Sequence, residues 1–120
     1  EQLEMHLYGT PGQRRFDFMW EILAIGAQAI VFLVDGSDAE SIEEGKYIHN
    51  HFGERLTIPE LVVVTKSDMP GAKTPAEVAA IMELAEDHVV ACDPRDSSAS
   101  RALLLSFYDR AEISTLEAVI

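Results

Sequence analysis

The sequence predicts an α/β domain of three layers, in which a parallel sheet lies between flanking helices. Apolar segments of strand length alternate with helix-like segments along the chain. The longest apolar segment, residues 29–34, is continuous rather than alternating, as in a strand that is covered on both faces. Helices of about ten to fourteen residues between strands are typical of right-handed βαβ units, which form parallel sheets.

Four strands are predicted from short apolar runs that are bounded by turn residues. They comprise residues 3–8, 29–34, 61–64 and 89–91. We expect them to lie in the sheet in chain order, because successive right-handed crossovers in one direction add neighbours on one side. Ligands of such folds bind at the carboxyl ends of the strands, so the residues after each strand are the first candidates for a site.

Four helices are predicted at residues 14–25 and 39–52, from residue 74 onward, and at about 98–110. Thr74 and Glu77 flank Pro75 in the pattern of a capping box, which marks the start of the third helix. The connecting helices should share one face of the sheet, and the last helix should cross to the other. The weakly patterned tail, residues 112–120, is expected to fray or to extend the last helix.

Composition narrows the classes of function. The 120 residues suit one domain, and no apolar run is long enough to span a membrane. The net charge of −12, with three lysines, repels phosphate backbones, so no nucleic acid partner is expected. The single cysteine, Cys92, excludes an internal disulfide and fits a reducing cytoplasm, where we expect the protein. The four histidines lack metal-binding spacing, and we assign them no metal.

Two motifs follow predicted strands at the spacing expected for one shared site. Residues 9–16, Gly-Thr-Pro-Gly-Gln-Arg-Arg-Phe, follow the first strand, and residues 65–68, Thr-Lys-Ser-Asp, follow the third. Each has a structural alternative, because a proline–glycine turn commonly connects a strand to a helix, and Lys-x-Asp triplets are frequent in solvated loops. Cys92 and Asp93 end the last strand, where the alternative for Cys92 is an inert buried thiol.

A phosphate-binding loop is absent from the sequence. No stretch matches G-x-x-x-x-G-K-[ST], and the only Gly-Lys pair, Gly45-Lys46, has Glu40 at the place of the first glycine. Phosphoryl transfer needs the backbone amides and the lysine of such a loop. We therefore expect these 120 residues alone to bind a nucleoside triphosphate weakly or not at all, and not to hydrolyse it.

The run Tyr8-Gly-Thr-Pro-Gly-Gln-Arg-Arg-Phe-Asp-Phe-Met-Trp20, followed by Val31-Phe-Leu-Val-Asp35, resembles the prokaryotic small Ras-like GTPases. This is the group related to the gliding-motility GTPase and often encoded beside roadblock-domain proteins. The resemblance implies a partial P-loop GTPase fold of Rossmann-like type. It also implies that residues 1–120 form one domain, the back part of a longer GTPase domain.

The resemblance assigns roles to the residues that match the family motifs. The Gly12 amide would contact the γ-phosphate, and Gln13 would orient the attacking water. The remaining matched residues would form the guanine site. Thr65 would tether neighbouring loops, and the alkyl stem of Lys66 would lie along the flat face of the base. The Asp68 carboxylate would accept hydrogen bonds from two adjacent N–H groups of guanine, and a backbone amide of Cys92 or Asp93 would contact the base oxygen. Arg14, Arg15 and Phe18 would form a partner surface.

The chain departs from the family pattern at several of these positions. Gly9 stands where an aspartate normally holds Mg²⁺ through water, and Arg14 replaces the glutamate after the glutamine. Thr65 replaces the asparagine of Asn-Lys-x-Asp, and Cys92-Asp93-Pro94 replaces Ser-Ala-Lys. The base pocket is therefore partly kept, while the phosphate and metal half is missing.

Three functions are compatible with these motifs. In the leading interpretation the intact protein is a switch that binds GTP with Mg²⁺, hydrolyses it and contacts a partner such as a roadblock-domain protein. No cofactor is expected on these 120 residues alone. The first alternative is a nucleotide-free pseudo-GTPase or scaffold that uses its second helix to bind a partner. The second is a receiver-like domain, with Asp35 as phosphoacceptor beside Lys66.

Overall fold

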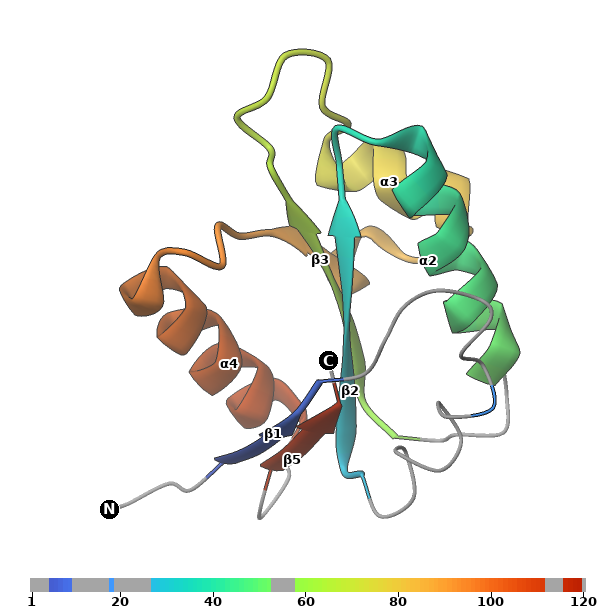
Figure 1. The fold of residues 1–120 in the computed structure, drawn as a ribbon. Coiled ribbons are helices and arrows are strands. Elements are labelled where there is room, and N and C mark those ends of the chain that lie inside the picture. The colour runs from blue at the N-terminus through green and yellow to red at the C-terminus, as the bar shows by residue number, and fades with distance from the viewer. Residues whose placement is uncertain (1–4, 10–17, 19–26, 53–57, 112–115, 120) are drawn as a thin grey trace.

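The protein forms a five-stranded parallel sheet with helices on both faces (Figure 1). The computed structural model describes residues 5–9, 18, 27–52, 58–111 and 116–119. The strands lie in the order β1 (Met5–Tyr8), β5 (Leu116–Val119), β2 (Ala29–Asp35), β3 (Glu60–Thr65) and β4 (Val89–Ala91). The helices are α2 (Ala39–Phe52), α3 (Pro75–Met82) and α4 (Ser97–Ala111), with a 3₁₀ turn at Glu86–His88. The predicted α/β class is confirmed.

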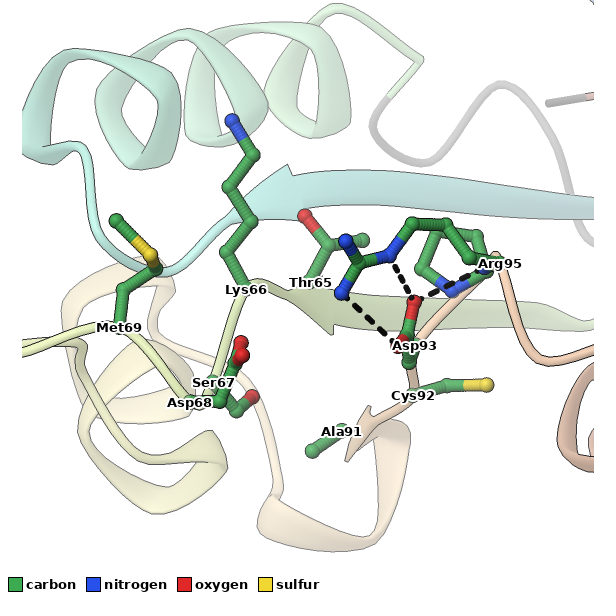
Figure 2. Close-up of a pocket in the computed structure, with 10 residues that line it drawn as sticks. Thr65, Lys66, Ser67, Asp68, Met69, Ala91, Cys92, Asp93 and Arg95 are labelled. Atoms are coloured by element: carbon green, nitrogen blue, oxygen red, sulfur yellow. Dashed lines mark hydrogen bonds and ion pairs between the residues drawn. The ribbon is translucent and has the colours of Figure 1, made fainter.

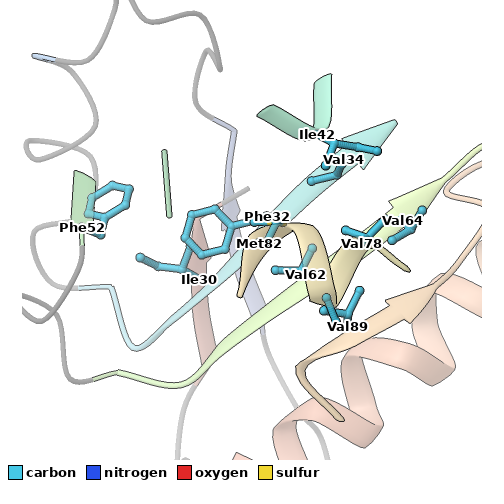
Figure 3. Packing of buried hydrophobic residues seen from close by; sticks show 11 residues of the cluster. Ile30, Phe32, Val34, Ile42, Phe52, Val62, Val64, Val78, Met82 and Val89 are labelled. Carbon is cyan, nitrogen blue, oxygen red and sulfur yellow. The ribbon is translucent and has the colours of Figure 1, made fainter. Parts of the chain in front are cut away.

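The two faces of the sheet carry separate apolar cores. Alternate residues of β2, such as Phe32 and Val34, pack with residues of α2 and α3, including Ile42, in one buried cluster (Figure 3). The intervening residues, such as Val31, pack instead with Phe107 of α4. From β2 to β4 the chain adds each new strand on the same side of the sheet, and after β4 it crosses back to β5 on the other side of β2. Right-handed crossovers in opposite directions place their helices on opposite faces, as predicted.

The C-terminal segment corrects one prediction. Residues 116–119 neither fray nor extend α4, because they form β5, a strand between β1 and β2. Met5–Tyr8 pairs along its length with Leu116–Val119, while Ala118 and Val119 pair with Ala29 and Ile30 of β2. Unpaired backbone groups of two neighbouring strands are costly when they are buried. Tertiary pairing therefore outweighs the weak local preference of this tail.

Close packing of α2 on β2 explains why Gly45 is glycine. A β-carbon at this position would lie 2.8 Å from Cγ2 of Val34, which is closer than side chains tolerate. Gly45-Lys46 therefore lies inside a helix that is packed against the sheet. This placement agrees with the conclusion that the pair is not part of a phosphate loop.

The capping box of α3 is present as predicted. Thr74 accepts a hydrogen bond from the backbone N–H of Glu77, whose carboxylate accepts from the N–H of Thr74. The helix ends at Glu83, which has left-handed backbone angles. The predicted helix at residues 14–25 lies outside the described residues apart from Phe18, which is helical and 65% exposed. Within the described ranges, no helix is long and apolar enough to cross a membrane.

Candidate functional site

A cavity of about 740 Å³ opens at the carboxyl ends of β3 and β4 (Figure 2). It is lined by residues 65–69, which follow β3, and by residues 91–95, which end and follow β4. Because the two strands are parallel neighbours, their carboxyl ends meet at one edge of the sheet. The sequence predicted a site at this edge. The volume of the cavity lies within the range of small-molecule pockets, roughly 300–1,000 Å³.

The end of β3 is held against the end of β2. The hydroxyl of Thr65 donates to the carbonyl oxygen of Val34 over 3.3 Å, and the N–H of Gly36 donates to the carbonyl oxygen of Thr65 over 3.0 Å. Directly after this point Lys66 has a φ of 57°, in the left-handed region that non-glycine residues rarely adopt. Such angles are found mainly where the surrounding structure enforces them, often at functional sites.

Lys66 is oriented by an ion pair with the last residue of β2. Its Nζ lies 3.1 Å from Oδ2 of Asp35. The other oxygen, Oδ1, accepts hydrogen bonds from the backbone N–H and the hydroxyl of Ser37, at 2.9 and 2.6 Å. The hydrogen bonds from Ser37 and the ion pair with Lys66 hold the pKa of the Asp35 carboxyl below its usual value. Asp35 thus stays ionised and fixes the direction of the Lys66 side chain.

The Asp35–Lys66 pair also bears on the receiver-like alternative. That hypothesis needs a phosphoacceptor aspartate near a lysine, and the two groups are in contact. It also needs acidic neighbours that hold a metal ion. In the part of the chain that the structure describes, no three His, Cys, Asp or Glu side chains gather closely enough to hold one.

Asp68 is the one carboxylate of the cavity that is left available. It is exposed, and it makes no hydrogen bond or ion pair with any described residue. In Figure 2 its carboxylate lies beside the opening between Lys66 and the segment that follows β4. A carboxylate in this state can accept hydrogen bonds from a ligand without first breaking a contact within the protein.

The two predicted residues at the end of β4 have different surroundings. The N–H of Cys92 donates to the carbonyl oxygen of Val64 over 3.1 Å and thus continues the sheet, while its side chain packs with the cluster beneath α4. The Asp93 carboxylate accepts three hydrogen bonds from Arg95, one from its backbone and two from its guanidinium. These hydrogen bonds hold the pKa of Asp93 below its usual value.

Arg95 is a cavity residue that the sequence analysis missed. Its Nε lies 3.0 Å from Oδ1 of Asp93, and its Nη2 lies 3.2 Å from Oδ2. Its hydrogen bonds to the Asp93 carboxylate, the attraction of that charge, and weaker attraction by Asp68 raise the pKa of the guanidinium above its usual value. The signal available in the sequence was Asp-Pro-Arg directly after a strand, because an aspartate side chain commonly accepts the N–H two residues on.

The remaining predicted site residues are not brought into this cavity by the described structure. Gly12, Gln13, Arg14 and Arg15 lie outside the described residues. Phe18 is described and exposed, as a surface residue should be, although no described contact links it to a partner. The described cavity therefore brings together the residues that were predicted to contact a base, on two loops at one edge of the sheet.

Comparison with known proteins identifies the family. Residues 1–114 match the family described as "Conserved hypothetical ATP binding protein". The chain belongs to this family. It is also similar to ADP-ribosylation factor-like protein 4D of Bos taurus, with 31% identity over 78% of this chain and 52% of that protein. The Homo sapiens protein of the same name matches at 31% identity over 78% of this chain and 51% of its own length. The chain thus spans about half the length of these curated relatives.

Proposed function

We propose that this chain is the base-binding part of a nucleotide-binding switch protein of the small GTPase type, and that its base is guanine. The cavity at residues 65–69 and 91–95 carries the proposal, because it presents the unpaired carboxylate of Asp68 beside Lys66, which is ion-paired with Asp35. Family membership and the similarity to ADP-ribosylation factor-like protein 4D support nucleotide binding. The resemblance to prokaryotic small Ras-like GTPases supports the switch.

Guanine suits the cavity better than adenine for a chemical reason. Guanine offers two adjacent N–H donors on one edge, and a carboxylate can accept both, whereas adenine offers one amino group beside a ring nitrogen that is itself an acceptor. The alkyl stem of Lys66 can cover one face of the base while its charge stays with Asp35. For the base oxygen we favour the N–H of Asp93, because the N–H of Cys92 is donated to Val64.

The phosphate side of the proposal depends on residues outside the described ranges. We propose that the Gly12 amide contacts the γ-phosphate, that Gln13 orients water in the intact protein, and that Arg14, Arg15 and Phe18 contact a partner such as a roadblock-domain protein. The intact protein would work in the cytoplasm with Mg²⁺. Among the described residues, no cluster of three His, Cys, Asp or Glu side chains could hold the ion, so we assign it no ligand there.

Two other functions lead to different results in the same experiment. The family's description as ATP-binding favours ATP, in which case adenine would occupy the cavity. A scaffold without nucleotide would leave the cavity unused and would bind its partner through α2. Because the cavity lies entirely within this chain, base binding can be tested on these residues without the phosphate half.

The test is an NMR titration of the ¹⁵N-labelled 120-residue chain with GMP and AMP, up to millimolar concentration. We expect GMP to shift the amides of residues 65–69 and 91–95, with an affinity too weak to detect for micromolar nucleotide. Asp68→Asn should abolish these shifts, because an amide loses one of the two acceptors. Asp87→Asn, an exposed change outside the cavity, is the matched control and should bind like the parent. Tighter binding of AMP would favour ATP, and no shift with either nucleotide would refute the proposal.

A further inference from the structure

The Arg95 side chain is held in one plane by Asp93. Nε and Nη2 of the guanidinium bond to the two carboxylate oxygens, and the backbone N–H of Arg95 donates to Oδ1 over 3.0 Å. A planar fork that is bound at two points cannot rotate freely. The side chain is nevertheless 80% exposed, so the flat faces of the guanidinium remain open.

Stability of the fold does not account for this arrangement. An ion pair between exposed side chains contributes little to folding, because water screens the charges and both side chains lose conformational freedom. The consequence of the pair is therefore geometric. It fixes the position of a flat cation at the wall of a cavity whose opposite loop carries Lys66 and Asp68 (Figure 2).

Two ion pairs beside the cavity hold its cations and leave the Asp68 carboxylate without an ion-pair partner among the described residues. Lys66 is held by Asp35, and Arg95 is held by Asp93. Asp68 has neither cation as a partner, although Arg95 is attracted to it. A guanidinium presents adjacent N–H donors, the same pattern as the edge of guanine. If Arg95 were released from Asp93, it could therefore occupy the acceptors of Asp68 as guanine would.

We propose that Asp93 is a positioning residue that holds Arg95 as a stacking wall for the purine base and keeps its guanidinium away from Asp68. This inference rests on the proposed function, because it concerns the same cavity. The base then lies between the alkyl stem of Lys66 and the open face of Arg95, with its donor edge at Asp68. Guanidinium groups stack on aromatic rings, so Arg95 supplies affinity without selecting one base over another.

The test uses GMP titrations of the 120-residue chain, monitored by NMR, with five variants. Arg95→Ala removes the wall and should weaken GMP binding by roughly five- to a hundredfold, the range found for loss of one stacking partner. Arg95→Lys keeps the charge but not the flat face, and should weaken binding nearly as much. Arg101→Ala changes an exposed arginine of α4 outside the cavity, and it should bind like the parent.

Asp93→Ala separates positioning from stacking. It frees Arg95 to compete for Asp68, so it should weaken GMP binding more than Arg95→Ala does. The double variant Asp93→Ala with Arg95→Ala lacks the competitor and should return to the affinity of Arg95→Ala alone. A merely structural pair would give equal losses in both single variants, and this result would overturn the positioning role.

The outcomes keep this inference distinct from the proposed function. Parent-like GMP binding by Arg95→Ala, with Asp68→Asn still inactive, would overturn the inference and leave the guanine site standing. Failure of the parent chain to bind either GMP or AMP would overturn both. Preserved dispersion of the amide signals shows that each variant is folded.

Discussion

The two halves of the sheet are built in different ways. On one side, β2 and β3 pair over six residues and β4 extends the sheet, with α2 and α3 packed on the same strands. On the other side, β5 pairs with β1 over four residues but with β2 over only two. The first half contains the cavity at residues 65–69 and 91–95. In the sequence, β1 of the second half is followed by the segment with Gly12 and Gln13. The proposed base site is thus built by neighbouring strands and their loops, whereas the proposed phosphate side involves residues outside the described ranges.

Leu33 of β2 shows where the two halves meet. Its side chain points to the same face as Val31, which is buried with the α4 cluster, yet Leu33 is 50% exposed. The pairing of β2 with β5 ends at Ile30, before it reaches Leu33. At the carboxyl end of β2, the face of the sheet toward α2 is therefore covered, while the opposite face is open at Leu33. Substitutions on these two faces test this difference directly.

The largest expected difference in the free energy of unfolding is between two side chains of similar size, Ile42 on the covered face and Leu33 on the open face. Ile42→Ala empties a position that is 2% exposed in the core of α2 and β2, and should lower the free energy of unfolding by about 2–5 kcal/mol. Leu33→Ala, the matched control, should cost much less because half of that side chain is already in water. Urea unfolding of both variants measures the difference. Equal losses would show that the open side is covered in solution.

A change on the phosphate side should leave base recognition intact. In a longer protein that includes the phosphate loop, Gln13→Leu should slow GTP hydrolysis on the order of a hundredfold, because leucine cannot hold the attacking water in place. GTP affinity and the guanine preference that depends on Asp68 should stay near the parent values. Single-turnover assays and nucleotide titrations measure the two effects. Hydrolysis at the parent rate would exclude the role of Gln13 and would direct attention to Arg14, Arg15 or a partner.

A tight contact at the edge of the cavity should couple stability to binding in the first half. A β-carbon on Gly36 would lie 2.6 Å from Cγ1 of Val64 and 3.3 Å from the carbonyl oxygens of Thr65 and Lys73. Gly36→Ala should therefore destabilise the fold by about 1–3 kcal/mol and weaken GMP binding through the displaced end of β3. Gly9→Ala has no described atom within 4 Å and serves as control, with a change within about 0.5 kcal/mol.

The smallest effect is expected at the amino end of β3, away from the cavity. His49 Nε2 lies 2.7 Å from Oε1 of Glu60, and this hydrogen bond lowers the pKa of the Glu60 carboxyl. A carboxyl whose pKa is lowered by folding stabilises the protein above its unfolded pKa, and the contribution is lost as the pH falls through the folded pKa.

Glu60→Gln should therefore lose stability at neutral pH, by less than about 1 kcal/mol since the pair is partly exposed, and should approach the parent in acid. Urea unfolding at both pH values checks this, with Glu86→Gln on the 3₁₀ turn as the exposed control. GMP affinity should not change. A weaker affinity would mean that the two ends of β3 are coupled.

Local signals in the sequence predicted most of the first half. Continuous apolar runs gave β2 and β3, and the capping box at Thr74 gave the start of α3. β5 was not predictable in this way, because four residues of weak pattern acquire their structure from the two strands beside them. The motifs also predicted residues that the structure brings together in one cavity, namely Thr65, Lys66, Asp68, Cys92 and Asp93. The direction of the Lys66 side chain and the clamp on Arg95 depend on backbone angles and on pairing between loops, which the motif does not encode.

The pairing of β1 with β5 also bears on how the protein is made. Met5 lies opposite Leu116, so a strand near the beginning of this sequence has its partner near the end. During synthesis β1 leaves the ribosome long before β5 exists, so its pairing with β5 has to wait until nearly all of this sequence has been made. Contacts between such distant residues form slowly, and exposed strand edges favour aggregation. β2, β3, β4 and α4 are all made before β5. The edge of β1 that pairs with β5 would then be the part of the nascent chain most in need of a chaperone.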